Sequence, residues 1–211
     1  LLDERMLKTP SIALQSVIKE TVRMGEIVRR SIEVAKDVLY TQDQEAIDIL
    51  KNDESDVDRL CAGITNYTIK LSSLQISEKE HQEAAQVLSD MERVSDYCEN
   101  ISEFAETLRD KKASFSETAK KQLKEMIEET AKSYFYALDA FKEQSHEKAL
   151  RVIEKETKVD DLEVKLRSRH IKRLSNNECN TEAGIVFLDT LVCMERISDH
   201  ARNIAEEVLE E

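Results

Sequence analysis

Pairs of carboxylates four residues apart recur along this chain, and their spacing suits cation binding. Four pairs follow the pattern acid-x-x-x-Asp: Glu54/Asp58, Glu92/Asp96, Glu156/Asp160 and Glu195/Asp199. Residues at i and i+4 lie on one face of a helix, with their Cβ atoms about 5–6 Å apart. Each pair can therefore reach one cation or two adjacent cations, and hard oxygen ligands suit magnesium, calcium, manganese or iron.

A solvated acidic surface explains any single pair equally well. The chain has 44 acidic residues, so some fall four apart by chance, and Arg93 and Arg196 follow two of the glutamates as ready ion-pair partners. Like charges at i and i+4 mildly destabilise a helix unless a counter-ion is present. Recurrence of the pattern at equivalent places in the chain therefore favours a bound cation.

That equivalence comes from an internal repeat. The segment MERVSD at 91–96 returns as MERISD at 194–199, an offset of 103 residues, and a motif at 54–60 returns at 156–162, an offset of 102. Two segments repeated at nearly one offset indicate a duplicated unit, with a period far longer than that of solenoid repeats. We expect a lead segment at residues 1–10 and two units, at 11–110 and 111–211.

Composition and periodicity predict an all-α fold. The chain has only 3 Gly, 1 Pro and 5% aromatic residues against 36% charged residues, so it lacks the turns and strand formers of a β-protein. Apolar spacing predicts helices over 12–39, 41–74, 77–108, 116–141 and 146–174, and a sixth, after a polar cluster at 175–178, that continues to 209. Thr41 with Gln44 and Ser77 with Glu80 look like capping boxes of the second and third helices. The short connections predict antiparallel neighbours, and hence two tandem three-helix bundles.

Several function classes are disfavoured. A net charge of −13 argues against nucleic acid or an anionic membrane surface as a partner. The four cysteines, at 61, 98, 179 and 193, lack CxxC spacing and fit reduced core residues. Neither a nucleophilic triad nor a phosphate-binding glycine loop occurs, so we expect a protein that is not an enzyme. Glu78/His81 and Glu143/His146 match a di-iron ligand pattern, but their places at predicted helix ends indicate surface residues.

The repeated motif resembles the signature of the PhoU family. The match is strongest over 195–206, ERISDHARNIAE, and weaker over 92–101, ERVSDYCENI, while the Glu54/Asp58 and Glu156/Asp160 pairs resemble the family's other acidic motif. The resemblance implies two pseudo-symmetric three-helix bundles whose carboxylates hold a divalent or trivalent metal ion such as iron, zinc, magnesium or manganese. Tyr97 and Cys98 stand where the family often has His and Ala, so the second unit is the stronger expected site. His200 is a further candidate ligand there.

Residues 1–10 and the start of the first helix resemble the segment that follows the membrane domain in bacterial sodium/phosphate cotransporters with a PhoU-like tail. This resemblance implies a regulatory domain at the cytoplasmic face of the membrane, with the membrane domain of the same chain as its partner and a homodimer left open. The alternative is a free-standing PhoU accessory protein of a phosphate ABC transporter and its histidine kinase. A carboxylate-bridged metalloenzyme and a metal-free structural bundle are further alternatives.

Overall fold

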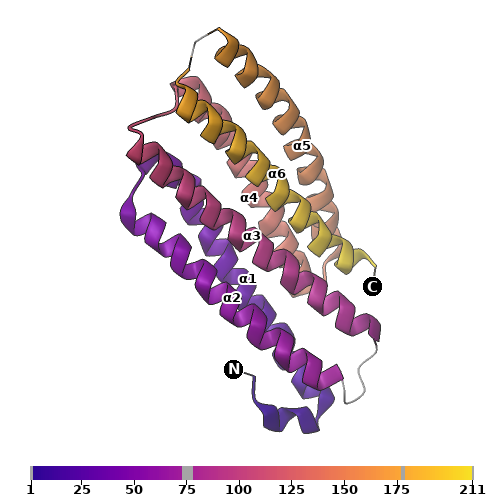
Figure 1. Cartoon of the computed structure of the whole chain (residues 1–211). Helices are drawn as coiled ribbons and strands as arrows, with labels where there is room; N and C mark the ends of the chain where they lie inside the picture. Colours follow the sequence, from indigo (N-terminus) through magenta and orange to yellow (C-terminus); the bar gives the residue numbers. More distant parts are fainter. Residues whose placement is uncertain (1, 73–77, 177–178, 211) are drawn as a thin grey trace.

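Long helices account for most of the chain in a computed structural model of residues 1–211 (Figure 1). The structure describes residues 2–72, 78–176 and 179–210. A short 3-10 helix, η1 (Glu4–Lys8), precedes six α-helices: α1 (Pro10–Thr41), α2 (Gln44–Ser72), α3 (Glu78–Asp110), α4 (Glu117–Glu143), α5 (His146–Ser175) and α6 (Thr181–Leu209). No strand occurs among these described residues, and the all-α prediction is confirmed.

The expected capping box at Thr41 and Gln44 is wrong. Thr41 is the last residue of α1, and its hydroxyl donates to the carbonyl of Asp37 within that helix. Gln42 then takes a left-handed conformation with φ 51°, which ends α1. The carboxylate of Asp43 accepts from the backbone N–H of Ala46 at 2.9 Å and so caps α2 in place of Thr41.

The last three helices begin after side-chain caps of the same kind, whereas α1 begins at Pro10 without a side-chain cap. Ser116, Ser145 and Asn180 accept from backbone N–H groups in the first turns of α4, α5 and α6. The cap of α6 is therefore Asn180, downstream of the polar cluster expected to form it. Ser77, proposed to cap α3, and residue 74, proposed to end the second helix, lie outside the described residues.

The helices form two three-helix units that share one core. The first three α-helices pack on one another, as do the last three, and the units meet where α3 lies along α6 and α1 along α4 (Figure 1). The largest fully buried side chains come from both units and include Met24, Leu88, Met91, Tyr134 and Phe187. The lead segment also belongs to this body, because η1 contacts α1 and α2 and the Tyr67 hydroxyl donates to the Asp3 carbonyl at 2.9 Å.

Polar contacts fix the seam between the two units. The buried hydroxyl of Tyr134 donates to the carbonyl of Gly25 at 3.2 Å, where α1 and α4 pack closely. Asp90, 2% exposed on α3, lies 2.7 Å from Nδ1 of His200 and accepts from the amide of Asn203 on α6 at 3.0 Å. The rings of Tyr97 and His200 stack at 5.9 Å. These two residues occupy the same place in the repeat, so the units face each other through equivalent positions.

Candidate metal centre

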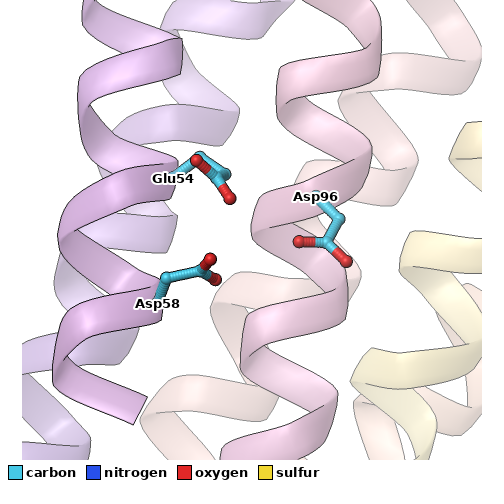
Figure 2. A group of neighbouring side chains, drawn as sticks. All are labelled: Glu54, Asp58 and Asp96. Carbon is cyan, nitrogen blue, oxygen red and sulfur yellow. The ribbon is translucent and has the colours of Figure 1, made fainter. Parts of the chain in front are cut away.

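Three carboxylates of the first unit converge on one point. Glu54 and Asp58 project from α2 and Asp96 from the facing part of α3, and each offers an oxygen within 4.8 Å of those of the other two. Figure 2 shows the three groups pointing toward one another across the gap between the helices. Glu54 and Asp96 are half-buried while Asp58 is exposed. We call this set the first carboxylate centre.

The second unit repeats the arrangement. Glu156 and Asp160 on α5 and Asp199 on α6 also offer oxygens within 4.8 Å of one another, and we call them the second carboxylate centre. Glu156 is buried, Asp199 half-buried and Asp160 exposed. Six of the eight carboxylates predicted from the spacing are thus brought together in threes.

The remaining two predicted ligands, Glu92 and Glu195, flank the centres without joining either group. Glu92 still raises the pKa of Asp96, and Asp199 and Asp160 raise the pKa of Glu195, whose half-burial acts in the same direction. Each glutamate lies one helical turn before its aspartate and so remains within electrostatic range. Each centre is therefore a group of three carboxylates with a fourth beside it.

Local sequence places these groups at the edge of the core. Val57 and Val159 are fully buried next to Asp58 and Asp160, which turns the carboxylates of α2 and α5 toward the neighbouring helix. On α3 and α6 the buried Val94 and Ile197 do the same for the aspartates. An apolar anchor beside each acid therefore fixes the rotation of the helix that presents it.

Charge in the first centre is poorly compensated. Partial burial, and then repulsion from Asp58 and Glu99, raises the pKa of Glu54 from 4.5 to about 7. Burial and Glu92 likewise raise the pKa of Asp96, opposed by Arg93, whose guanidinium lies 3.7 Å from that carboxylate. Carboxylates in such a group need a shared proton or a cation.

The second centre carries its own counter-ion. Arg202 donates to Glu156 at 2.8 Å and to Glu206 at 2.7 Å, and these hydrogen bonds raise the pKa of the arginine. Burial still raises the pKa values of Asp160 and Asp199, with Glu156 adding to both shifts. An arginine within hydrogen-bonding distance supplies part of the positive charge that a metal ion would otherwise bring.

Glu99 and Arg202 are the site residues that motif spacing missed. They occupy the same position of the repeat, three residues after Asp96 and Asp199, yet one is acidic and the other basic. Glu99 has a pKa raised first by burial and then by Glu103, and it in turn raises the pKa of Glu54. Comparison of the two motif copies beyond the shared acids would have found this reversal of charge.

His200 lies between the two centres rather than in one of them. Its ring lowers the pKa values of both Asp96 and Asp199, while its Nδ1 is held at 2.7 Å from Asp90. The described groups of converging ligands consist of carboxylates alone. Histidine ligation, expected as an option at the second centre, is therefore not needed to account for either group.

The Glu143/His146 motif lies away from the centres, whereas Cys61 lies beside the first one, where burial and then the charges of Glu92, Asp58 and Asp96 raise its pKa. His146 is an exposed first residue of α5, and Glu143 pairs with Lys148 at 2.6 Å; the side chain of His81 lies outside the description. All four cysteines are free. Burial raises the pKa of Cys193 to about 12, so this thiol stays protonated.

Metal-free protein is expected to lose stability as the pH rises toward 7. The pKa of the Glu54 carboxyl is about 7 in the folded chain and 4.5 in the absence of the fold. The folded state therefore binds the carboxyl proton more tightly than the unfolded state does. The stability that this protonated carboxyl contributes is fully present below pH 4.5 and is lost as the pH rises through about 7. The variant Glu54→Gln should show a flatter decline in melting temperature between about pH 5 and pH 7.5 in chelator, whereas the exposed Glu154→Gln should retain the wild-type slope. Equal slopes in wild type and Glu54→Gln would contradict the assignment.

Several known proteins are similar to this chain in sequence. A PhoU homologue of Xylella fastidiosa, named as an accessory protein of a phosphate-specific transport system, is 27% identical over 97% of this chain and 86% of its own length. PhoU homologue 1 of Thermotoga maritima is 31% identical over 57% of this chain and 51% of its own length. YjbB of Escherichia coli, whose name connects it with inorganic phosphate export, is 24% identical over 100% of this chain but only 39% of its own length. The chain thus spans about half or less of two of these relatives.

The fold and a family model agree with the relatives. The crystal structure of PhoU from Pseudomonas aeruginosa superposes with a TM-score of 0.85, at 21% identity, over 93% of this chain and 95% of that one. This similarity confirms the fold of two tandem three-helix repeats. The model of the PhoU domain matches residues 21–105 and again residues 123–208, one match in each unit. Because these two matches together cover more than half of the sequence, the chain belongs to the PhoU domain family.

Proposed function

We propose that this chain is a regulatory accessory unit of phosphate transport, without enzymatic activity, that binds metal ions at its carboxylate centres. One observation carries the proposal: each of the two stretches that match the PhoU domain holds an equivalent group of three converging carboxylates. The relatives named as accessory proteins of phosphate-specific transport support the transport assignment.

The donor set fits a hard metal ion. Three oxygens within 4.8 Å of one another can share one cation, and burial, followed by repulsion from neighbouring carboxylates, raises the pKa values of Glu54 and Asp96. Carboxylate-only sets suit magnesium, manganese or iron better than zinc, which prefers histidine and cysteine ligands. The chain would hold the ion between two helices and so stiffen their packing.

Two forms of the accessory unit remain as proposals. The Xylella relative, which matches nearly end to end, supports a free-standing accessory protein working with a phosphate transporter, and we place this form first. The Escherichia coli relative supports a regulatory tail of a larger transporter, because it contains a region matching the whole of this chain within a much longer protein. In that second form, a sodium/phosphate cotransporter included, the partner is the membrane domain of the same polypeptide and the unit lies at the cytoplasmic face.

No described helix has both the length and the apolar character that a bilayer crossing requires. The two proposed forms differ in how the native protein is held at the membrane, because only the second includes a membrane domain. Antibody detection after an alkaline wash of cell membranes should find a free-standing accessory protein in the wash and a transporter tail in the pellet.

Function is tested by phosphate uptake in cells that lack their own PhoU-family proteins. Expression of the native protein should restore restraint on uptake when phosphate is plentiful, and the variant Glu54→Gln/Asp58→Asn/Asp96→Asn should not. A matched control, Glu45→Gln/Asp48→Asn/Glu154→Gln, removes the same charge from exposed positions and should behave as wild type. The proposal fails if the wild-type protein leaves uptake unchanged, or if the control and the centre variant have equal effects.

A further inference from the structure

We propose that the C-terminal half of α5 docks on an anionic phospholipid surface. The residues that would touch the lipid, here called the α5 outer face, are Val164, Lys165, Arg169, Ile171 and Lys172. All five side chains are exposed, Val164 by 67% and Ile171 by 50%, which is high for large aliphatic residues. This part of the helix therefore presents cations and aliphatic groups to solvent together.

The position of α5 leaves this face open. Among the described residues, α5 packs only against α4 and α6, at the edge of the molecule (Figure 1). Val164 and Ile171 are seven residues apart, as are Lys165 and Lys172, and seven residues make about two helical turns. The same pair, an aliphatic residue followed by a lysine, is thus repeated along the outward side of the helix.

The cations of this face are not neutralised by the fold. Positions 164–177 contain five basic residues and no acidic residue. Two of the five, Arg167 and Arg173, have partners, because Arg167 pairs with Glu163 and Arg173 lies 3.1 Å from the ring of His170. The other three form no ion pair within the part of the chain that the structure describes: Lys165, Arg169 and Lys172.

The first unit shows that the repeat does not require these cations. The offset of 102 makes the α5 outer face equivalent to five positions of α2, namely Ala62, Gly63, Tyr67, Ile69 and Lys70. Lys70 is the one basic residue among them, and it pairs with Glu4 of the lead segment. Positions 62–75 hold a single basic residue where 164–177 hold five. The excess of cations therefore belongs to the second unit alone.

The net charge of −13 disfavours an anionic membrane for the chain as a whole, but it does not decide binding at this end of α5. At 0.1 M salt, charges further apart than about 10 Å are largely screened from one another. Glu163, the last acidic residue of α5, is paired with Arg167. Arg169 and Lys172 lie about 12 Å and 16 Å along the helix from Asp161, the acid before it. These cations can therefore meet an anionic surface on their own.

Aliphatic side chains among the cations favour a lipid surface over other anionic partners. At a membrane interface, aliphatic groups enter the acyl boundary while lysine and arginine reach the phosphate head groups. Ile185 on α6, 52% exposed, adds a third aliphatic group, because its neighbour Gly184 contacts His170 of α5. A single-stranded nucleic acid would use aromatic side chains on which its bases stack, and the α5 outer face has none.

The test measures co-sedimentation of the full chain with vesicles of phosphatidylcholine, with or without an equal share of phosphatidylglycerol. Wild-type protein should bind only the anionic vesicles. Lys165→Gln/Arg169→Gln/Lys172→Gln should weaken this binding about 100-fold, since each cation at an anionic surface contributes roughly fivefold. Val164→Ser/Ile171→Ser should weaken it about tenfold, because two aliphatic groups no longer leave water on binding.

Lys8→Gln/Lys19→Gln/Arg59→Gln is the matched control, because it removes the same charge from exposed positions outside the second unit. It should bind the vesicles as wild type does, and melting curves should show that all the variants are folded. No binding to anionic vesicles, equal binding to neutral ones, or equal losses from the control and the α5 cation variant would overturn the proposal.

Two further outcomes would overturn it in favour of a different partner. Tighter binding of a polyglutamate peptide than of anionic vesicles would assign the α5 outer face to an acidic protein segment. A wild-type dimer that Lys165→Gln/Arg169→Gln/Lys172→Gln converts to a monomer would assign it to a second copy of this chain. Metal binding and restraint of phosphate uptake are measured separately, so failure here would leave the proposed function standing.

Discussion

Adding manganese to chelator-treated protein should raise its melting temperature by about 5–10 °C when the free ion is about 100-fold above its dissociation constant. A ligand that binds only the folded state stabilises it by about 2.7 kcal/mol at that excess. For a chain of this size each kcal/mol moves the melting temperature by about 2–4 °C. The shift arises because the cation replaces repulsion among Glu54, Asp58 and Asp96 with shared attraction.

Variants of each centre should show how much of the rise in melting temperature comes from each. Glu54→Gln/Asp58→Asn/Asp96→Asn should abolish the greater part of the shift and should itself melt higher than metal-free wild type, since it removes the repulsion. Glu156→Gln/Asp160→Asn/Asp199→Asn should remove a smaller part, because Arg202 already compensates that centre. Calorimetric titration provides the independent measurement. Wild-type protein that takes up no manganese, magnesium or iron would refute metal binding regardless of the carboxylate geometry.

Reversing the charge of Glu99 or of Arg202, which occupy the same position of the repeat, should have the second large effect, on metal affinity. Glu99→Arg is expected to weaken metal binding at the first centre by tenfold or more, and Arg202→Glu to strengthen it at the second centre by a similar factor. Two unit charges about 8 Å apart interact by about 0.5 kcal/mol even in bulk water. A divalent ion and a change of two charge units quadruple this to about 2 kcal/mol, which exceeds the 1.4 kcal/mol that corresponds to tenfold in affinity.

Each charge reversal is best measured in a protein whose other centre has its three carboxylates replaced by amides. Metal then binds at one centre only, and the titration reports on that centre. Lys121→Glu is a useful control for the first centre, because Lys121 is exposed on α4 and its replacement makes the same change of two charge units outside α2 and α3. If Glu99→Arg and Arg202→Glu shift affinity in the same direction, the two centres do not differ in the way their charges indicate.

Helix content and duplication could be predicted because both depend on the spacing of residues along the sequence. Six helices follow from apolar periodicity in a chain with 3 Gly and 1 Pro, and two motif copies at offsets near 103 reveal the repeat. Helix ends were less predictable, because several polar residues compete for one capping position. Asp43 caps α2 where Thr41 was expected, since the left-handed Gln42 moves the start of the helix by two residues.

The site could be predicted only in part, because one-dimensional spacing does not show how a helix is rotated against its neighbour. Spacing found the pairs, but only the packing of α2 on α3 shows that Asp96, and not Glu92, completes the first group. The contribution of Glu99 and Arg202 depends on contacts across helices that no motif encodes. Departures at Tyr97 and Cys98 made the second unit the stronger expectation, yet its arginine leaves the first centre with the greater electrostatic demand for a cation.

The stacked pair of Tyr97 and His200 bears on how far the two units can differ. In a two-fold homodimer of identical three-helix units, a residue at this place would meet its own copy, and every substitution would appear twice. Within one polypeptide that constraint is absent, so a tyrosine faces a histidine and Asp90 has partners that its counterpart, Cys193, lacks the chemistry to bind. The two halves of the seam can therefore specialise separately.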